Sequence, residues 1–307
     1  MTDDHPRVLV VGYAAFDTIM PVAGRPAVDS KVEVAAIHEG GGGPGATAAV
    51  ALSRLGASVR FLGALTDDPA GRLQREELAA AGLDLSACPV LAGHASPRAI
   101  ILVNEEGGAR TIFWSRGDLP PLDPALADPS LLDGIDLLYT DGHDAPTAAI
   151  LAREARRRNI AVVMDAGSVR EGSAELVTAC TDVISSEIFA HDLTGVRDPA
   201  AALRALADLG PTRVGMTLGA HGVLGLVDGT PVRLAAFDVP VTDTTGAGDA
   251  FHAGYARALL AGADFFACLD HGQAVAALKC RDWGGRRGLP SLPEVEALLA
   301  GDRRRTP

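Results

Sequence analysis

The sequence predicts an α/β protein with a mostly parallel central sheet, because strand-like and helix-like segments alternate along most of the chain. Short apolar runs typical of buried strands occur at Val8 to Val11, Val59 to Leu65, Ile135 to Tyr139, Ile160 to Met164, Asp182 to Ile184 and Val214 to Leu218. Helical patterns lie between several of them, at Ala46 to Leu55, Pro69 to Ala81, Pro146 to Arg158 and Ala200 to Leu209. With 48% apolar and 21% charged residues, the 307-residue chain can form a full core, which excludes intrinsic disorder.

Two regions break this alternation and predict a second, smaller sheet. Lys31 to His38 alternates between apolar and polar residues, and Ala99 to Val103 and Arg110 to Trp114 flank a turn-forming stretch. Half-exposed strands of this kind suit a small antiparallel sheet that covers a site as a lid. We expect one domain over residues 1–307, with lid strands within about 13–39 and 97–116.

Charge and composition exclude several classes of partner. Lys and Arg total 27 against 39 Asp and Glu, a net charge of −12 that disfavours binding to nucleic acid or anionic lipid. No apolar run approaches the roughly 18 residues of a membrane span, and the first residues lack the basic start of a signal peptide, so we expect a cytoplasmic protein. The four cysteines are widely spaced, which favours buried thiols over a zinc site or a disulfide framework.

The lysine positions exclude the commonest phosphate-binding motif. Lys31 and Lys279 are the only lysines, and neither follows glycine in a Gly-Lys-Ser/Thr sequence, so the chain has no P-loop. The protein-kinase motifs are also absent. Any nucleotide phosphates must be held by another arrangement.

Two glycine-rich segments each precede a helical pattern. Gly40 to Gly45 leads into the first helix, where glycines let backbone approach a ligand and free N–H groups favour oxygen atoms. A flexible loop is the simpler interpretation, and a dinucleotide-binding loop, with Asp67 as its acid, is a further one whose strand context is poor. Thr217 to Gly222 follows another expected strand and is either a ligand-binding sheet edge or a plain hairpin turn.

The segment from Asp243 to Asp249 carries the clearest chemical signal. Gly246, Ala247 and Gly248 start a helix, and their N–H groups at the positive end of the helix dipole can form an anion hole. Asp249 at its edge can accept the proton of a hydroxyl that attacks an electrophile held in that hole. The alternative is that Asp249 is only a helix cap.

Together these segments resemble the ribokinase (PfkB) family of carbohydrate kinases. The resemblance rests on Gly42-Gly-Pro-Gly-Ala-Thr47, Thr217-Leu-Gly-Ala-His-Gly222 and Asp243-Thr-Thr-Gly-Ala-Gly-Asp249, in matching order over nearly the whole chain. Arg110 to Trp114, Asp141 to His143 and Ala276 to Cys280 look most like the ketohexokinase and sulfofructose kinase branch. The implied fold is a ribokinase-like, Rossmann-type sandwich with a small β-sheet lid.

The resemblance also implies roles for individual residues. Asp249 would be the base, and the amides of Gly246, Ala247 and Gly248 would stabilise the transferring phosphoryl group. The acceptor sugar would contact Asp17, Gly42, Gly43, Thr47, Asp141, His143 and Asp249, with Lys31 on the lid as a candidate partner for an anionic tail. ATP would contact Thr217, Gly219, Gly222, Gly248 and Gln273. Asp243 and Thr245 fall where many members bind a monovalent cation such as K⁺.

Three departures from the family pattern limit this comparison. Thr47 stands where asparagine is common, and one hydroxyl cannot replace both contacts of an amide. The usual magnesium motif is absent near Ser186 to Phe189, so Glu187 is the remaining acidic candidate for contacting Mg²⁺ through water. His143 stands where relatives often carry arginine, and both it and Lys31 have ordinary surface roles as alternatives.

These observations predict an ATP- and Mg²⁺-dependent sugar kinase that forms a homodimer through its lid. A ketose such as fructose is the first choice of acceptor, sulfofructose the second and a nucleoside the third. A non-catalytic sugar-binding regulator and a nicotinamide oxidoreductase are the alternatives from other classes.

Overall fold

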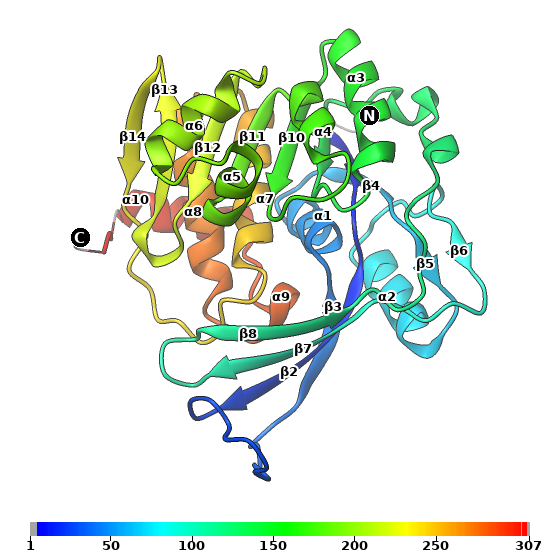
Figure 1. The fold of residues 1–307 in the computed structure, drawn as a ribbon, viewed down its shortest axis with the longest axis vertical. Helices are drawn as coiled ribbons and strands as arrows, with labels where there is room; N and C mark the ends of the chain where they lie inside the picture. Colours follow the sequence, from blue (N-terminus) through cyan, green and yellow to red (C-terminus); the bar gives the residue numbers. More distant parts are fainter. Residues whose placement is uncertain (1–4, 302, 306–307) are drawn as a thin grey trace.

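The computed structural model describes residues 5–301 and 303–305, and its largest sheet is the predicted parallel one (Figure 1). The 8-stranded sheet has the order β14-β13-β12-β11-β10-β9-β1-β4, parallel from β4 to β12 and antiparallel at the β13–β14 edge. Its strands are β1 (Arg7–Val11), β4 (Ser58–Leu62), β9 (Leu137–Thr140), β10 (Ala161–Ala166), β11 (Asp182–Ser186), β12 (Arg213–Thr217), β13 (Val223–Val227) and β14 (Thr230–Leu234).

Helices cover both faces of this sheet. One face packs on α1 (Pro44–Arg54), α7 (Ala247–Leu260), α8 (Phe265–Lys279) and α10 (Leu292–Gly301). The other packs on α3 (Ala145–Arg157), α4 (Ser173–Ala179), α5 (Glu187–Thr194) and α6 (Pro199–Ala207). The remaining helices are α2 (Pro69–Ala80), α9 (Gly284–Arg287) and the short turns η1 (Pro124–Leu126), η2 (Pro129–Leu132) and η3 (Gly219–His221).

Several helices begin where the sequence supplies a cap. Asp68, Asp198 and Asp264 each accept a hydrogen bond from a backbone N–H in the first turn of α2, α6 and α8. The first two are followed by proline, whose missing N–H is not needed at that position. These local signals fix where the helices start between the strands of the main sheet.

A second sheet of four strands forms the lid below the main body in Figure 1. Its order is β3-β2-β7-β8, with strands β2 (Ala15–Val22), β3 (His38–Gly42), β7 (Arg98–Asn104) and β8 (Arg110–Ser115). One face buries Ile19, Ala99, Ile101 and Val103 against Trp283 of the main body. A separate pair, β5 (Leu65–Thr66) and β6 (Val90–Leu91), lies near the base of the lid.

The expected strand from Lys31 to His38 is wrong. The structure has irregular backbone up to Ile37, and β3 begins only at His38. Val32 and Ile37 are 52% and 60% exposed, so the alternation in sequence buries no apolar face that could stabilise a strand. The other lid strand in the expected range 13–39 is β2, which follows β1 after a short break, although no pattern within Ala15–Val22 had been singled out.

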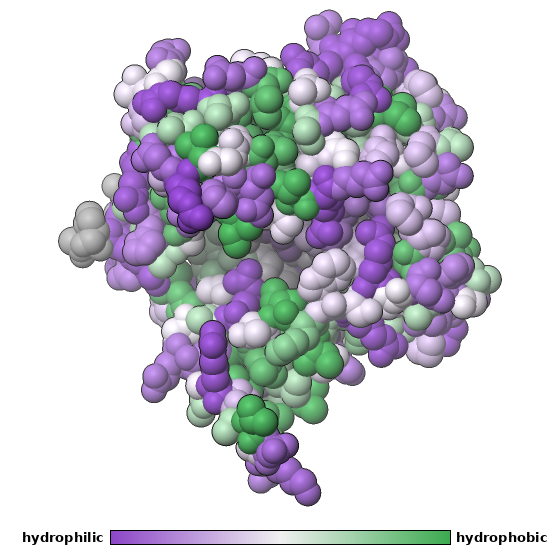
Figure 2. Space-filling model, in the orientation of Figure 1, coloured by the Kyte–Doolittle hydropathy of each residue, from purple (hydrophilic) through white to green (hydrophobic). Residues whose placement is uncertain are grey.

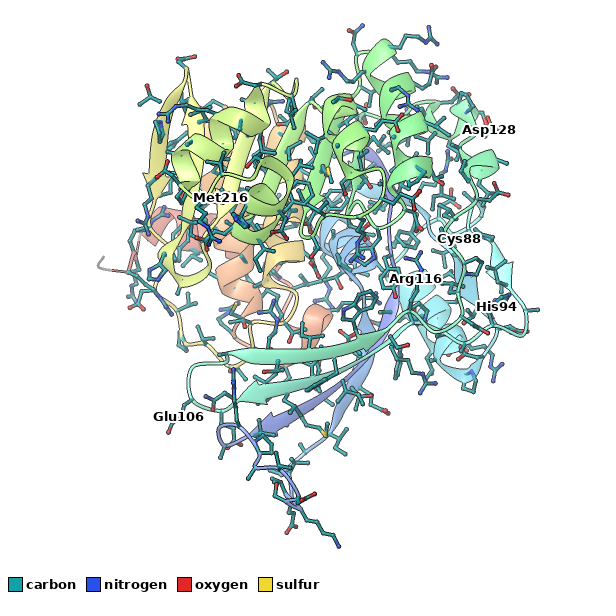
Figure 3. The ribbon with its side chains drawn as sticks, in the orientation of Figure 1. Cys88, His94, Glu106, Arg116, Asp128 and Met216 are labelled. Carbon is teal, nitrogen blue, oxygen red and sulfur yellow. The ribbon has the colours of Figure 1, made fainter. Side chains whose placement is uncertain are left out.

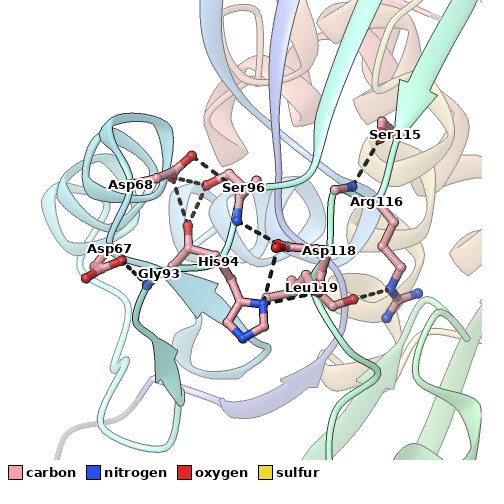
Figure 4. Close-up of polar contacts among 12 residues, drawn as sticks. Asp67, Asp68, Gly93, His94, Ser96, Ser115, Arg116, Asp118 and Leu119 are labelled. Atoms are coloured by element: carbon pink, nitrogen blue, oxygen red, sulfur yellow. Dashed lines mark hydrogen bonds and ion pairs between the residues drawn. The ribbon is translucent and has the colours of Figure 1, made fainter.

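The base of the lid is fixed by carboxylates, as the close-up in Figure 4 shows. Asp68, the cap of α2, accepts hydrogen bonds from the N–H and hydroxyl of Ser96 just before β7. Asp118, just after β8, accepts one from the N–H of Ala95 at 2.7 Å. The start of β7 and the end of β8 are therefore tethered to each other and to the start of α2.

The cysteines form no disulfide bond, as their spacing predicted. All four cysteines are free, and Cys180, Cys268 and Cys280 are buried. Cys88, labelled in Figure 3, is partly buried. Within the described part of the chain, no helix has the length and apolar character needed to cross a membrane.

Candidate active site

The loop before α7 presents free backbone donors. Gly246 has a φ of 75°, and a Cβ placed on it would lie 2.7 Å from the Cα of Gly285, so glycine is needed there on both counts. The N–H of Ala247 donates to the carbonyl of Thr244, whereas those of Gly248 and Asp249 have no acceptor among the described residues. A Cβ on Gly248 would meet no atom within 4 Å. Two donors without an acceptor therefore lie at the positive end of a 14-residue helix, with open space beside Gly248.

Asp249 lies in the first turn of α7 with its carboxylate unengaged. The side chain is partly buried, and no described residue makes a hydrogen bond or ion pair with it. Burial, together with the charge of Asp165, raises its pKa to about 7, although the charges of His252 and Arg110 oppose this shift. A carboxylate with a pKa near neutrality, beside free N–H donors, suits general base catalysis at neutral pH.

His252 and Asp165 form a buried pair near Asp249, which no motif in the sequence had indicated. The Nδ1 of His252 lies 2.7 Å from the carbonyl of Gly248 and 3.3 Å from a carboxylate oxygen of Asp165, and its Nε2 lies 3.0 Å from the carbonyl of Ile184. Burial raises the pKa of Asp165 to about 8. Because His252 contacts the Gly248 carbonyl, it orients the peptide that joins Gly248 to Asp249.

The rear of the same loop is clamped by a lysine and an aspartate. Asp243 accepts hydrogen bonds from the N–H groups of Thr245 and Gly284, both at 2.8 Å. The fully buried ammonium of Lys279 donates to the carbonyls of Asp243 at 2.9 Å and Asp282 at 3.4 Å. Burial lowers the pKa of Lys279, while the charge of Asp243 opposes that shift. The loop is thus joined to the end of α8.

The lid closes over this loop through its β7–β8 turn. The hydroxyl of Thr244 donates to the carbonyl of Gly108 at 2.9 Å, and Arg110 of β8 donates to the same hydroxyl at 2.9 Å. Figure 2 shows a hollow between the main body and the lid. Arg110 makes no ion pair with a described residue and lies close enough to lower the pKa of Asp249.

Asp17 lies on the lid strand β2, close enough to Asp249 for that charge to raise its pKa. It lies on β2 opposite Gly40, and a Cβ on Gly42 would come within 2.1 Å of its carboxylate. Burial raises the pKa of Asp17 to about 7, an effect that Arg286 opposes and Asp249 increases. Asp17 is only 7% exposed and makes no hydrogen bond with a described residue, so a ligand hydroxyl can take this role.

Arg286 holds the glycine-rich segment in place through a hydrogen bond to its backbone. Its guanidinium donates to the Gly42 carbonyl at 2.8 Å and lies 3.3 Å from the carboxylate of Glu77 on α2. A Cβ on Gly41 would overlap this guanidinium at 2.0 Å. The glycines there are therefore required by close packing, and part of the segment expected to be a loop is strand β3.

Asp141 uses its carboxylate within the protein. It accepts hydrogen bonds from the backbone N–H groups of Tyr13 at 2.8 Å, Gly45 at 2.7 Å and His143 at 2.9 Å. It therefore joins the ends of β1 and β9 to the start of α1. Gly43, with a φ of 86°, caps α1, and Thr47 in that helix has a buried hydroxyl with no partner among the residues described.

His143 and Lys31 have different surroundings. His143 stacks on Tyr13 and contacts Arg170 through Nε2 at 3.0 Å. Lys31 is exposed within the irregular segment 23–37, which extends away from the main body at the tip of the lid in Figure 1. His143 therefore has contacts with Tyr13 and Arg170, whereas Lys31, the candidate for an anionic tail, lies on the exposed segment.

The residues expected to hold ATP lie on both sides of the anion-hole loop in the sequence: Thr217, Gly219 and Gly222 precede it, and Gln273 follows it. Thr217 ends β12, and Gly219 and Gly222 bound η3 with φ values of 56° and 91°. A Cβ on Gly219 would meet nothing within 4 Å, which leaves room for a ligand. Gln273 of α8 is 6% exposed, and its buried Nε2 lacks a partner in the described chain.

Glu187 is the exposed first residue of α5. The described residues contain no group of three or more His, Cys, Asp or Glu side chains able to hold a metal ion.

Sequence reasoning missed those site residues whose partners are remote in the chain. The sequence assigned no role to Arg286, Asp165, His252, Tyr13 or Arg170. The position of Asp165 at the end of an apolar run was the one available signal, because ligands bind at the carboxyl ends of parallel strands.

Comparison with known proteins agrees with this geometry. The family model described as pfkB family carbohydrate kinase matches residues 5–292. An ATP-dependent ribose-1-phosphate kinase from Halopiger xanaduensis is 29% identical over 96% of this chain and 97% of its own length, and a ribokinase from Bacillus subtilis is 28% identical over 96% and 99%. The structure of Arabidopsis thaliana ribokinase, complexed with ribose and ATP, has the same fold, with a TM-score of 0.80 at 22% identity over 96% and 99% of the two chains.

The match spans both sheets, the glycine-rich segment and the loop that ends at Asp249. The chain therefore belongs to the pfkB family of carbohydrate kinases, phosphotransferases that act on an alcohol group with ATP as donor.

Proposed function

We propose that this kinase transfers the γ-phosphoryl group of ATP to a terminal hydroxyl of a ketose, with Asp249 as the general base. The observation that carries the proposal is the pairing of an unengaged carboxylate with the free N–H groups of Gly248 and Asp249. A protein that only binds sugar needs no such base. The ketose follows from the branch resemblance of Arg110 to Trp114 and Asp141 to His143.

In this mechanism Asp249 accepts the proton of the acceptor hydroxyl while that oxygen attacks the phosphorus. The free amides and the Gly246–Gly248 turn stabilise the negative charge of the transferring group. Asp17 accepts hydrogen bonds from sugar hydroxyls and, with Gly42, Gly43 and Thr47, orients the acceptor. Positioning and charge stabilisation replace the P-loop that the chain lacks.

ATP itself is assigned to the edge formed by Thr217, Gly219, Gly222 and Gln273. The unpartnered Nε2 of Gln273 and the open space at Gly219 support this assignment. Glu187 is the residue we propose would contact the water shell of a Mg²⁺ ion bound with the nucleotide, which would neutralise charge on the phosphates. The exposed carboxylate of Glu187, at the start of α5, fits this indirect role, because Mg²⁺ keeps several of its waters when it binds with phosphates.

A monovalent cation at Asp243 and Thr245 is suggested by the resemblance. Both carboxylate oxygens of Asp243 already accept a hydrogen bond from a backbone N–H group, and the Lys279 ammonium donates to its backbone carbonyl. We therefore propose that added K⁺ has at most a small effect, since a protein ammonium already supplies positive charge there.

The lid supports a proposal about assembly. Ile100 and Phe113 are directly opposite each other on β7 and β8 and are 48% and 59% exposed. Figure 2 shows hydrophobic side chains gathered over the lid. We propose a cytoplasmic homodimer that buries this face, and Phe113→Asp should convert it to a monomer in sedimentation or light-scattering measurements.

The proposed reaction is tested by ADP release with ATP and a panel of acceptors. Fructose, 6-deoxy-6-sulfofructose, ribose, ribose 1-phosphate and adenosine cover the ketose class, its sulfonated analogue, the acceptors named by relatives and a nucleoside. Turnover of fructose or sulfofructose at least tenfold above the others supports the ketose proposal. Activity confined to adenosine would refute it, and calorimetric sugar binding without ADP formation would favour a regulator.

A further inference from the structure

A cluster of aromatic and basic side chains lies at one end of the lid hollow. The rings of Tyr13 and His143 stack with centroids 4.3 Å apart, and Trp114 meets them edge-on at 6.5 and 6.3 Å. The guanidinium of Arg170 lies 5.6 Å from the centre of the Trp114 ring. These residues come from the segments after β1, β9 and β10 and from β8 of the lid, so the cluster exists only in the folded chain.

Two buried polar atoms in this cluster have no hydrogen-bond partner among the described residues. They are the hydroxyl of Tyr13, a residue only 6% exposed, and the Nδ1 of His143. Buried polar atoms are almost always paired in folded proteins, so two unpaired ones in stacked rings indicate a missing ligand.

Each of these atoms can act as a donor. Burial lowers the pKa of His143, which keeps the ring neutral. Its Nε2 faces the Arg170 guanidinium at 3.0 Å and must accept, so the ring proton lies on Nδ1. The tyrosine hydroxyl can donate as well. The cluster therefore offers donors from Tyr13, His143 and Arg170.

Charge in the cluster is uncompensated at Arg170. Its neighbour Arg116 pairs with the buried Asp144 at 2.9 Å, and the carboxylate of Asp141 already accepts three backbone N–H bonds. No described carboxylate pairs with Arg170. A guanidinium in this condition suits the oxygens of a phosphate, sulfonate or carboxylate. A nucleobase, which also presents donors, would leave some of its groups unmatched here.

The register of the lid strands places this cluster within the reach of a sugar that is bound at Asp17. Asp17 lies opposite Ala99, and Ala99 lies opposite Trp114, so the three form one row across β2, β7 and β8. Side chains in such a row share a face, and Asp17 and Trp114 are separated by two strand spacings, or roughly 10 Å. A sugar held by Asp17 can therefore carry a substituent that reaches Arg170.

We propose that Tyr13, His143 and Arg170 form a subsite for an anionic group on the acceptor, at the end remote from the hydroxyl that is phosphorylated. This inference rests on the proposed sugar kinase activity and narrows it to acceptors that carry a phosphate, sulfonate or carboxylate. Trp114 packs against Arg170 and closes the subsite from the lid.

The test compares Arg170→Gln with the wild type on matched acceptors. Fructose is paired with 6-deoxy-6-sulfofructose and with fructose 1-phosphate, ribose with ribose 1-phosphate, and 2-dehydro-3-deoxygluconate represents a carboxylate. The wild type should prefer one anionic acceptor to its neutral counterpart. Arg170→Gln should lower kcat/KM for that acceptor by roughly 10- to 150-fold, the effect of losing a hydrogen bond to a charged group, and change neutral acceptors less than threefold.

Two further variants separate the subsite from general damage. Tyr13→Phe removes only the hydroxyl and should weaken anionic acceptors alone, by a smaller factor than Arg170→Gln. Arg153→Gln removes an exposed arginine that pairs with Glu175 on the outer helices and should change nothing. Thermal unfolding of each variant verifies that it folds.

Calorimetric binding decides the inference independently of turnover. Weaker binding of the anionic acceptor to Arg170→Gln supports the subsite even if no ADP is released, a result that would contradict only the kinase proposal. A wild type that prefers neutral sugars or adenosine would overturn the subsite. An equal loss for neutral and anionic acceptors in Arg170→Gln would also overturn it.

Discussion

The two ends of the proposed active site are built in different ways. At the transfer end, the Gly246–Gly248 turn and Asp249 are consecutive in the sequence, and helix α7 positions them directly. At the acceptor end, Asp17 and Arg286 come from opposite ends of the chain, and the anion subsite adds side chains from further segments. The first arrangement is local, whereas the second depends on the register of the lid and the order of the main sheet.

This difference explains how much the sequence could predict. The Asp243–Asp249 motif, the parallel sheet and the lid pair Ala99 to Val103 and Arg110 to Trp114 were all readable because each is encoded by adjacent residues. The strand at Lys31 to His38 was predicted wrongly, since alternation alone does not show that a face is buried. Arg286 and Arg170 could not be assigned, because their partners are remote and become neighbours only after folding.

The largest effect is expected at the transfer end. Asp249→Asn removes the proton acceptor but keeps the size of the side chain, so kcat should fall by about 10²–10⁴-fold. Binding of ATP and sugar, measured by calorimetry, should change little, because Asp17 and the nucleotide edge are untouched. Full turnover in this variant would contradict the proposed mechanism.

Lys279 should matter next, because its buried ammonium holds the anion-hole loop against the end of α8. Lys279→Met keeps the length of the side chain without its charge, and displacement of the loop should lower kcat by roughly 10- to 100-fold. Steady-state kinetics measure the loss. Unaltered kcat in a folded Lys279→Met variant would show that the tether is dispensable.

At the acceptor end, Arg286→Met should raise the KM for the sugar by about tenfold or more, because the Gly42 carbonyl and Glu77 lose their shared partner. Breaking this pair should also cost roughly 3 kcal/mol of stability, near the lower end for buried pairs because Glu77 is partly exposed. Initial-rate kinetics and thermal unfolding measure the two effects. A change in kcat with an unchanged KM would place Arg286 at the transfer end instead.

The smallest effect should come from the monovalent cation. Replacing K⁺ with tetramethylammonium at constant ionic strength should change wild-type kcat less than about twofold, because Lys279 supplies the positive charge near Asp243. A strict K⁺ requirement would show that Asp243 and Thr245 bind an ion despite the neighbouring ammonium. The same titration on Lys279→Met would then reveal whether K⁺ restores the lost activity.

The pH dependence of kcat/KM tests the role of Asp249 most directly. Burial and Asp165 raise the pKa of Asp249 to about 7, and the base must be ionised to accept a proton, so activity is lost as pH falls through this value. We predict that kcat/KM, which reports groups of the free enzyme, rises at least tenfold per pH unit below pH 7, levels off above pH 8, and depends less steeply on pH in Asp249→Asn. A wild-type profile that is flat from pH 5.5 to 8.5, with the chemical step rate-limiting, would contradict the assignment of Asp249 as the base.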